Sequence, residues 1–266
     1  MSGKRFAGKV ALMTGATQGI GLATARRVGL EGGKVVVSSR REENVKEAVT
    51  QLREEGIEAS GTTCHQGKYD DRKKLMDFAK DKYGGFDSVF MCAGVNPHIG
   101  NILTVTESQF DKAFATNVKE NFLFIRECLP HLEERGGGSI VTNGTAAGSD
   151  VGMAFIGADI RLYTVSKFTL AAMVYLVAVE CFNRHVRVNC VIPGPIDTPF
   201  LAGGVQSDPF NKHLKVRGIK NTDPSGRIGK PSEVAAVVAF LLSEDSSYVT
   251  GESIACAGPQ SASRFL

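Results

Sequence analysis

Short runs rich in Val and Ile alternate with longer helix-like stretches along almost the whole chain, and this alternation restricts the possible folds more than any other feature. The runs that we interpret as buried strands are Val10–Met13, Val35–Val37, Glu58–Cys64, Val89–Met91, Ile140–Val141, Val186–Ile192 and Ile254–Ala255. Helices are predicted near 20–31, 42–55, 71–83, 107–134, 163–183 and 231–242. The pattern predicts an α/β fold, a Rossmann-like doubly wound parallel sheet of about seven strands with helices on both faces.

The chain is predicted to form a single domain over residues 1–266, because no linker, repeat or low-complexity tract interrupts it. Folds of this class often run to about 250 residues as one domain. One irregular region, near 195–230, has little periodicity and contains Gly203-Gly204, Pro209 and Pro224. Long loops inside compact domains usually serve function, so we interpret this region as a substrate lid.

The composition is that of an ordinary globular protein and excludes several classes. Hydrophobic residues make up 42% of the chain and charged residues 22%, which argues against a disordered or collagen-like protein. The net charge of +3 is too small to indicate a nucleic-acid-binding protein. The six cysteines form no C-x-x-C pair and no group with histidines at zinc-ligand spacing, so we expect no metal site and reduced, intracellular thiols.

The sequence indicates neither a membrane span nor a secretory signal. No apolar run reaches the roughly 18–20 residues that cross a bilayer, and the first six residues lack an apolar core. We therefore expect no membrane partner and a cytoplasmic location. The C-terminus is close to a peroxisomal signal, but Phe265 separates Arg264 from the final Leu266, which leaves a peroxisome-like organelle as the alternative.

The first predicted strand leads directly into a glycine-rich turn, residues 14–21, and a helix follows. Glycines permit a tight turn and a close approach of the backbone to a pyrophosphate, and the N-terminus of the next helix offers free N–H groups. The spacing is G-x-x-x-G-x-G rather than G-x-G-x-x-G. In its strand–turn–helix setting the turn predicts dinucleotide binding by Gly15, Thr17, Gly19, Ile20 and Gly21.

Three further motifs follow the glycine turn along the chain. They are Thr116-Asn117-Val118, Tyr163-Thr164-Val165-Ser166-Lys167, and Pro193-Gly194 followed by Ile196-Asp197-Thr198. In this order and spacing the four motifs resemble those of the short-chain dehydrogenase/reductase family, from about Lys9 to Gly258. Within that family the chain is most similar to the NADP-dependent carbonyl reductases of the peroxisomal group, on the basis of Ser38-Ser39-Arg40, Cys64-His65, Val95-Asn96-Pro97 and 135–139.

Tyr163 and Lys167 are four residues apart and therefore share one face of a helix. A phenol titrates near 10, and a nearby ammonium is expected to lower its pKa towards the working range. Tyr163 is then a candidate general acid for a carbonyl oxygen, or a base in the reverse direction. The resemblance implies that Lys167 also holds the nicotinamide ribose and that Asn117 supports a water in the proton relay beyond the lysine.

The resemblance also implies a hydroxyl at the end of the fifth strand that holds the substrate carbonyl, where the family has serine. Thr145 occupies the matching position and keeps a hydroxyl donor, with an added methyl group and a stiffer χ1. The stretch from Thr145 to Tyr163 is longer than the family's usual spacing. Ser149 would restore that spacing, so it is the alternative source of the hydroxyl.

Cofactor choice is predicted from the end of the second strand, Val37-Ser38-Ser39-Arg40-Arg41. Relatives that bind NAD place an acidic residue there for the ribose 2′-OH. Hydroxyls and guanidinium groups stand here instead, which suits the 2′-phosphate of NADP(H), with Arg40 and Ser39 as contacts. The alternative is that the arginines form a solvated helix start.

The resemblance implies two more cofactor segments. Ala93 and Gly94 would let the adenine ribose approach, although Cys92 replaces the family's asparagine and loses a strand-bracing hydrogen bond; we interpret Cys92 as a packed thiol. Pro193, Gly194, Ile196 and Thr198 would clasp the nicotinamide carboxamide. Apolar residues of the predicted lid, Phe200, Leu201, Val205 and Phe210, indicate a lipophilic substrate, and His98 could line the same pocket or lie on the surface.

These observations favour reduction of a ketone or aldehyde by hydride transfer from NADPH. The alternatives are an NAD-dependent alcohol or sterol dehydrogenase on the same fold, and a catalytically impaired dinucleotide-binding sensor or scaffold. The helices near 107–134 and 163–183 are apolar around much of their circumference, including Phe110, Phe114, Phe122, Phe124, Phe168 and Tyr175. By resemblance they pair across a two-fold axis, so a homo-oligomer, dimer or tetramer, is expected.

Overall fold

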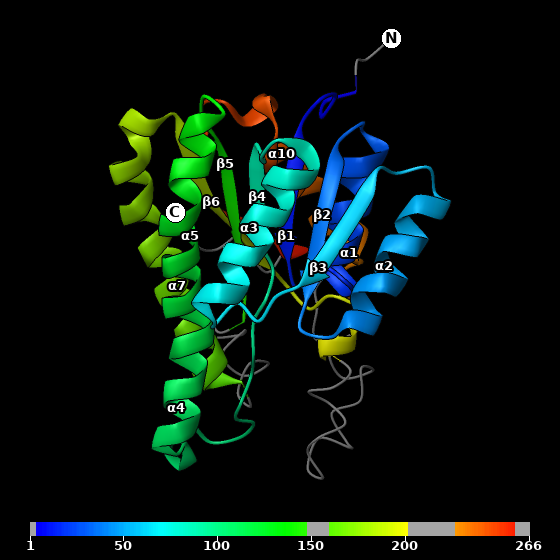
Figure 1. The fold of residues 1–266 in the computed structure, drawn as a ribbon. Helices are drawn as coiled ribbons and strands as arrows, with labels where there is room; N and C mark the ends of the chain where they lie inside the picture. The colour runs from blue at the N-terminus through cyan, green and yellow to red at the C-terminus, as the bar shows by residue number, and fades with distance from the viewer. Residues whose placement is uncertain (1–3, 148–159, 202–226, 259–266) are drawn as a thin grey trace.

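The computed structural model describes residues 4–147, 160–201 and 227–258. Seven strands form one parallel sheet in the order β3-β2-β1-β4-β5-β6-β7 (Figure 1). The strands are β1 Val10–Thr14, β2 Lys34–Ser39, β3 Ala59–Thr63, β4 Ser88–Met91, β5 Gly138–Asn143, β6 Val186–Pro193 and β7 Ser253–Cys256. The predicted doubly wound α/β fold is therefore confirmed, and every predicted strand corresponds to an observed one.

Six predicted helical stretches are also present, with one of them divided. The helices are α1 Gly19–Leu30, α2 Glu42–Glu54, α3 Tyr69–Tyr83, α4 Glu107–Phe114, α5 Glu120–Glu134, α7 Arg161–Cys181 and α10 Pro231–Leu242. Short 3₁₀ turns occur at η1 Ile102–Thr104, η3 Phe182–Arg184 and η4 Glu244–Ser246. The stretch predicted as one helix near 107–134 is divided by a π-helical turn, η2 Ala115–Lys119.

This π-helical turn marks a local departure from regular hydrogen bonding. A π-turn inside an α-helix disturbs the regular backbone pairing and often lies at a functional site. The side chain of Asn121 compensates, because its Nδ2 donates to the carbonyl oxygens of Thr116 at 3.2 Å and Asn117 at 3.0 Å. The turn therefore fixes the position of Asn117 within the helix pair.

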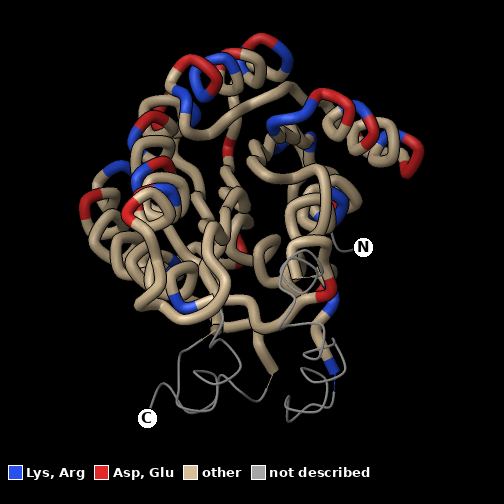
Figure 2. The backbone as a smooth tube through the Cα atoms, turned by 90° about the horizontal axis from the view of Figure 1, so that it is seen from below, with Lys and Arg blue, Asp and Glu red and all other residues tan. Residues whose placement is uncertain are grey.

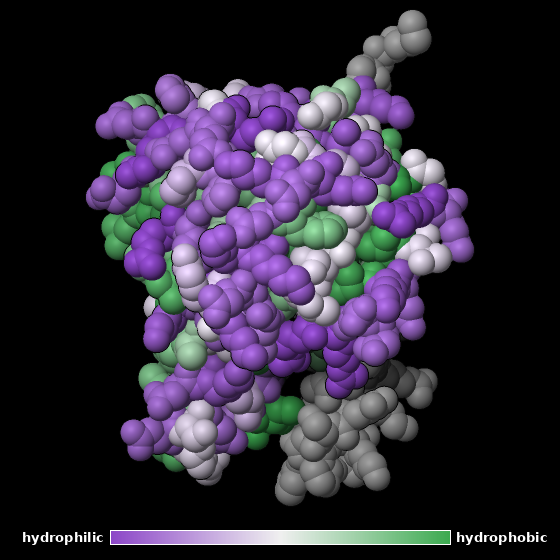
Figure 3. All heavy atoms as spheres, viewed as in Figure 1, coloured by the Kyte–Doolittle hydropathy of each residue, from purple (hydrophilic) through white to green (hydrophobic). Residues whose placement is uncertain are grey.

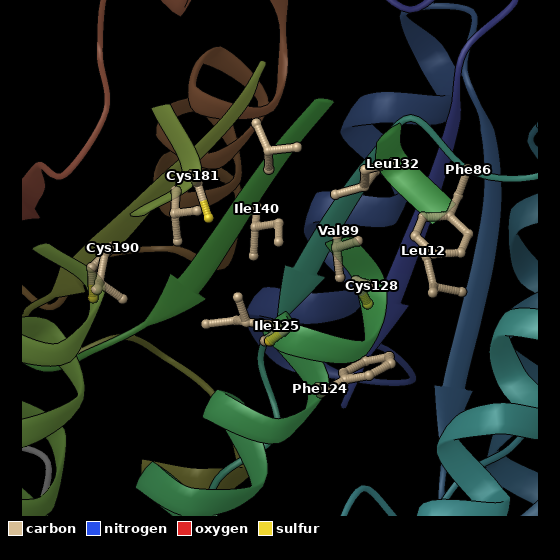
Figure 4. Close-up of a cluster of buried hydrophobic side chains, with 14 of the residues drawn as sticks. Leu12, Phe86, Val89, Phe124, Ile125, Cys128, Leu132, Ile140, Cys181 and Cys190 are labelled. Atoms are coloured by element: carbon tan, nitrogen blue, oxygen red, sulfur yellow. The ribbon is translucent and has the colours of Figure 1, made fainter. Parts of the chain in front are cut away.

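Two apolar clusters bury the two faces of the sheet. Alternate residues of β1 point to opposite faces: Val10 and Leu12 belong to one cluster, and Ala11 and Met13 to the other. Helices α3, α5 and α7 cover the first face, and α1, α2 and α10 cover the second. Figure 4 shows the first cluster, where Phe124 and Cys128 of α5 point towards the strands. Lys and Arg, like Asp and Glu, concentrate on the surrounding helices (Figure 2).

Helix α7 is long and apolar enough to cross a membrane by length and composition alone, over Arg161–Glu180, a possibility that the search for apolar runs in the sequence did not raise. Its packing accounts for this character: 44% of the most apolar window is buried in the fold, and the helix contacts β5, β6 and the η2 turn. The helix also buries the cationic side chain of Lys167. We therefore interpret α7 as a core helix.

One side of the molecule leaves apolar side chains exposed. In Figure 3 the face over α3 is mostly hydrophilic, and hydrophobic surface gathers at the upper left, where α7 ends in Figure 1. The exposed apolar residues of α4, α5, α7 and η3 are Phe110, Phe122, Val165, Phe168, Tyr175, Leu176, Val179 and Phe182. Of the apolar residues predicted around the circumference of these helices, Phe124 is fully buried in the core, and Phe114 is half-buried and stacks on Phe110 at a centroid distance of 4.5 Å.

Candidate active site

A cavity of ≈ 540 Å³ lies at the carboxyl ends of the strands, the end of the sheet seen in Figure 2. The chain runs outward from β1 to β2 and β3 and then returns to β4 on the other side of β1, so the strand order reverses there. Ligands of doubly wound sheets bind at such a reversal. The predicted site residues on the cavity wall are Gly15, Thr17, Gly19, Ile20, Ser39, Arg40, Ala93, Gly94, Thr145, Tyr163, Lys167, Pro193, Gly194, Ile196 and Thr198.

The glycine turn fits a dinucleotide at the level of the backbone. Helix α1 begins at Gly19 with no side-chain cap from Gln18 and no acidic residue in its first turn. Its first N–H groups are thus available to an anion, and the helix dipole favours a negative charge there. Gly15 and Gly19 have positive φ of 61° and 55°, values that favour glycine.

Gly21 does not line the cavity, and its role in the turn is packing. A Cβ added at Gly21 would lie 2.4 Å from the carbonyl oxygen of Gly15 and 2.6 Å from the Cα of Ala16. Only glycine permits this approach of α1 to the turn. Gly21 therefore holds the shape of the turn, and its predicted contact with a cofactor stays a prediction.

The end of the cavity next to β2 carries exposed cationic side chains. Ser39 ends β2, and Arg40 and Arg41 follow it on the wall. Within the described parts of the chain neither arginine has an ion-pair partner, and the Ser39 hydroxyl donates weakly to the Arg41 carbonyl oxygen at 3.3 Å. Free guanidinium groups and a nearby hydroxyl suit a phosphate.

At the opposite end, α7 places Tyr163 and Lys167 together against β5. Tyr163 is 7% exposed and Lys167 is 1% exposed, and the Lys167 Nζ lies 5.7 Å from the centroid of the Tyr163 ring. The ammonium donates to the carbonyl oxygen of Asn143, the last residue of β5, at 2.7 Å. The two side chains therefore stand side by side on the cavity wall, as their spacing predicts.

The pKa of Tyr163 differs from the sequence-based expectation. Burial raises the pKa of the phenol above its ordinary value, and the neighbouring ammonium does not reverse this shift. Burial also lowers the pKa of Lys167 to about 8. The expected lowering of the tyrosine pKa is therefore wrong for the chain by itself, because burial is the largest cause of the shift and raises the pKa of the phenol. Tyr163 stands as a neutral proton donor.

Asn117 lies behind the cavity wall and not on it. Its Oδ1 accepts from the Val95 N–H at 2.9 Å, and its Nδ2 donates to the Val95 carbonyl and to Ser166 Oγ, both at 2.9 Å. Ser166 in turn donates to the Tyr163 carbonyl at 2.7 Å. Asn117 thus joins the segment after β4 to α7 beside Tyr163; its support of a relay water stays a prediction.

Thr145 lies on the wall just beyond β5 and is 8% exposed. Its Oγ1 accepts from the Ala147 N–H at 3.2 Å, an arrangement that leaves the hydroxyl proton free to donate. Ser149, the alternative, lies outside the described residues, as do 202–226 of the predicted lid. The structure therefore brings Thr145 to the same end of the cavity as Tyr163 and leaves the comparison with Ser149 open.

The segment after β4 approaches both the glycine turn and the buried lysine. A Cβ added at Gly94 would lie 3.1 Å from Lys167 Nζ and 3.3 Å from Asn117 Oδ1, and one at Gly15 would lie 2.8 Å from the Ala93 N. Cys92 also lines the cavity, and burial raises the pKa of its thiol to about 11. This value agrees with a packed thiol, because a thiolate is needed for nucleophilic attack.

The segment after β6 completes the wall. Thr198 Oγ1 donates to the Ile196 carbonyl at 3.3 Å, and the Phe200 ring lies 5.4 Å from the Tyr163 ring. Phe200 and Leu201 make this part of the wall apolar. His98 does not line the cavity: it is buried and bonds Thr104 Oγ1 through Nε2 at 3.0 Å, so neither its predicted pocket position nor the surface alternative holds.

Several wall residues were not predicted from the sequence. The most polar of them follow β3 or lie on α4, the η2 turn and α5: His65, Gln66, Lys112, Thr116 and Glu120. Arg40 was predicted from its place at the end of β2, and the residues after β3 hold the equivalent place at the neighbouring strand. The four-residue spacing of Thr116 and Glu120 indicates that they share a helix face. In the described chain, no three His, Cys, Asp or Glu side chains gather as a metal site.

Comparisons with known proteins agree with this geometry. A family model described as enoyl-(acyl carrier protein) reductase matches residues 15–258. The chain is 40% identical over 253 residues to human (Homo sapiens) dehydrogenase/reductase SDR family member 4, a match that covers 95% of this chain and 87% of that protein. It is 39% identical over 254 residues to human dehydrogenase/reductase SDR family member 2, mitochondrial, covering 95% and 86%.

Solved structures show the same fold. The crystal structure of levodione reductase has a TM-score of 0.89 and 28% identity, over 97% of this chain and 99% of that one. A variant of actinorhodin polyketide ketoreductase with NADPH has a TM-score of 0.85 and 29% identity, over 98% and 99%. The similarity thus extends over the cavity as well as the sheet.

Proposed function

Because this chain belongs to the short-chain dehydrogenase/reductase family, and so is an oxidoreductase, we propose that it reduces a ketone or aldehyde with NADPH. The observation that carries the proposal is the arrangement of the cavity. Tyr163, Lys167 and Thr145 converge at one end, and Ser39 and Arg40 stand at the other, with the free N-terminus of α1 between them. This wall offers contacts for both ends of a dinucleotide.

The residues would share the work as follows. When bound, the reduced nicotinamide supplies the hydride that the carbonyl carbon accepts. Thr145 donates a hydrogen bond to the carbonyl oxygen, and Tyr163 gives that oxygen a proton, which leaves an alcohol and a phenolate. Lys167 stabilises the phenolate by its positive charge, and Asn117 joins the segment after β4 to α7 through its hydrogen bonds.

The pKa shifts describe the protonation states from which reduction would start. A phenol whose pKa is raised by burial remains protonated at neutral pH, which is the form that a general acid requires. The pKa of Lys167, lowered to about 8, keeps most of the ammonium charged at neutral pH. Burial opposes the phenolate that forms when Tyr163 gives up its proton, so the positive charge of Lys167 would be needed to stabilise it.

The positions of the cofactor-binding residues support NADP(H). Gly15, Thr17, Gly19 and Ile20 would hold the pyrophosphate, and Ser39 and Arg40 the 2′-phosphate. Ala93 and Gly94 would face the adenine ribose. Lys167 would hold the nicotinamide ribose; Pro193, Gly194, Ile196 and Thr198 would hold the carboxamide. The substrate would be lipophilic, since Phe200 and Leu201 adjoin Tyr163.

The proposed partner is a second copy of the chain. The exposed apolar side chains of α4, α5, α7 and η3 form a face of the kind that marks protein–protein contacts. A homodimer or homotetramer would cover it, and solution mass tests this. A cytoplasmic location is also proposed, and imaging of the full chain fused to a fluorescent protein tests it against a peroxisome-like organelle.

A substrate panel tests the proposed activity. Dicarbonyls, quinones, retinoids and steroids are incubated with the protein and NADPH, and loss of NADPH absorbance is followed, with NADH in parallel. We expect turnover of at least one lipophilic carbonyl with NADPH preferred. Turnover of alcohols with NAD alone would favour the dehydrogenase alternative, and tight NADPH binding without turnover of any member would favour the sensor or scaffold.

A further inference from the structure

The cavity extends beyond the residues considered so far into a region next to β3, which we name the β3 lobe. Its wall is formed by Cys64, His65, Gln66, Lys112, Thr116 and Glu120. Strands β2 and β3 are neighbours in the sheet, so the lobe adjoins the end of the cavity where Ser39 and Arg40 lie. A dinucleotide whose 2′-phosphate rests on Arg40 has its purine base on the same ribose. The lobe is therefore the part of the cavity that the base would enter.

Glu120 places a carboxyl group in this lobe from the start of α5. The residue is 9% exposed, and it has no ion-pair partner among the described residues. Its hydrogen bond is a long one, from Thr116 Oγ1 to Oε1 at 3.5 Å. Burial raises the pKa of Glu120, and the charges of Lys112 and His65 offset part of this shift. A buried carboxylate with so little hydrogen bonding is costly unless a donor approaches it.

Two neighbouring residues shape the surroundings of this carboxyl group. A Cβ added at Gly67 would lie 2.4 Å from Glu120 Oε1, so glycine at this position lets the carboxyl group pack closely against the chain after β3. Thr14 Oγ1 donates to Gln66 Oε1 at 2.8 Å and so orients the Gln66 amide. The Nε2 of Gln66 has no hydrogen-bond partner among the described residues. The lobe therefore contains a buried amide group without a partner for its Nε2 and a carboxyl group with one long hydrogen bond among the described residues.

The chemistry of the dinucleotide selects which of its groups can face Glu120. Phosphates repel a carboxylate, and the ring nitrogens of a purine that lack hydrogen are acceptors. The 6-amino group is the one hydrogen-bond donor group of adenine, whereas a 6-oxo purine presents an acceptor at that position. Resting on the proposed function, we propose that Glu120 accepts a hydrogen bond from the adenine 6-amino group and makes the site select adenine over a 6-oxo purine.

Binding of two dinucleotides tests the proposal; the second carries a 6-oxo group in place of the 6-amino group and a hydrogen on the adjacent N1. Isothermal titration calorimetry gives the Kd of NADPH and of reduced nicotinamide hypoxanthine dinucleotide phosphate. For the unaltered chain we expect NADPH to bind at least about tenfold more tightly, because a 6-oxo group presents lone pairs to the carboxylate where the amino group would donate. In Glu120→Gln the ratio should fall to about threefold or less, since a glutamine amide can present either a donor or an acceptor.

A control on the same helix separates this effect from loss of a negative charge on α5. Glu134 lies at the end of α5, where it is exposed and pairs with Lys80 at 2.9 Å. The Glu134→Gln variant should keep the tenfold ratio. Circular dichroism of each variant establishes that it is folded.

The outcomes separate this inference from the proposed function. NADPH binding with an unchanged ratio in Glu120→Gln would overturn the role of Glu120 and leave the proposed function standing. Failure of the unaltered chain to bind NADPH would overturn both. Should Glu120→Gln not fold, the unaltered chain decides: equal affinity for the two dinucleotides overturns the inference, and a tenfold preference for NADPH supports it.

Discussion

At the Tyr163 end of the cavity, Asn117 and Lys167 are buried and joined by hydrogen bonds to the segment after β4, to α7 and to β5. At the other end Arg40 is exposed and makes no ion pair among the described residues. Lys167 contributes to packing, because its ammonium holds the end of β5, and in the proposed function it would also contribute to the chemistry. Arg40 contributes little to the folded state. Under the proposed function, the difference teaches that the reaction geometry would be tied to the stability of the fold, while cofactor choice would rest on side chains that can change without disturbing it.

The largest expected effect is on turnover at the buried end. Tyr163→Phe removes the hydroxyl while keeping the ring against Phe200, so turnover of any substrate found should fall about 10²- to 10⁴-fold. NADPH affinity should change by less than about threefold, since the loss concerns one hydrogen bond at most. NADPH oxidation and calorimetry measure the two quantities.

Tyr175→Phe provides the control for that change. Tyr175 lies on the same helix and is 60% exposed, away from the cavity wall. The Tyr175→Phe variant should leave turnover unaltered. Full turnover by Tyr163→Phe would show that Tyr163 is not the acid.

Removal of the Thr145 hydroxyl tests the other proposed contact to the carbonyl oxygen. Thr145→Val keeps the shape of the side chain and should lower turnover about 10²- to 10³-fold, the usual effect of losing one donor to a developing oxyanion. Thr145→Ser keeps the donor and should lose far less. Should Thr145→Val remain active and Ser149→Ala lose activity, Ser149 supplies the hydroxyl.

The buried ammonium predicts a pH-dependent stability without cofactor. The pKa of Lys167 is about 8 in the folded chain against an ordinary value of 10.5, so the unfolded chain binds more protons between these values. The stability of the unaltered chain should therefore rise with pH across this window, by about 3 kcal/mol relative to Lys167→Met. Urea unfolding of both proteins at pH 7.5 and 10.5, roughly the two ends of that window, measures the difference.

The unaltered chain and Lys167→Met share all other titratable groups, so the contributions of those groups cancel in the stability difference. A constant stability difference across the window would mean that the Lys167 ammonium is not desolvated. The contrast between a buried and an exposed end of the cavity would then be lost.

The smallest expected effect belongs to the exposed end. Arg40→Ala should weaken NADPH binding roughly ten- to a hundredfold, the value of charge-assisted hydrogen bonds to one phosphate, and leave NADH binding unchanged. Stability should stay within about 0.5 kcal/mol, as for other exposed positions. Arg26→Ala, also on the surface but outside the cavity, is the control. An unchanged preference for NADPH in Arg40→Ala would show that Arg40 does not bind the 2′-phosphate.

The fold could be read from the sequence because its strands are short apolar runs that occupy both faces of a parallel sheet. The predicted and observed strands differ mainly at their ends: β5 extends over Gly138–Asn143 although only Ile140–Val141 is continuously apolar. The π-helical turn at Ala115–Lys119 was not predicted, because it depends on the tertiary position of Asn117 and on compensation by Asn121. Periodicity alone carries no such information.

The site could be predicted where a motif coincides with the end of a strand or one face of a helix. Tyr163, Lys167 and Arg40 meet this condition. The raised pKa of Tyr163 could not be predicted, because it follows from burial and from the 5.7 Å separation of Lys167 from the ring. Glu120 was also missed, since its place in the cavity depends on how α5 packs beside β3. Gly21 and His98 show the reverse case, in which the residue packs away from the cavity wall.

The most direct test of the central claim is a crystal structure of the chain with NADPH bound. The account predicts that the dinucleotide spans the cavity, with the 2′-phosphate on Arg40, the pyrophosphate at the N-terminus of α1 and the nicotinamide beside Tyr163. A dinucleotide bound in the opposite direction, or an empty cavity in crystals saturated with NADPH, would contradict it.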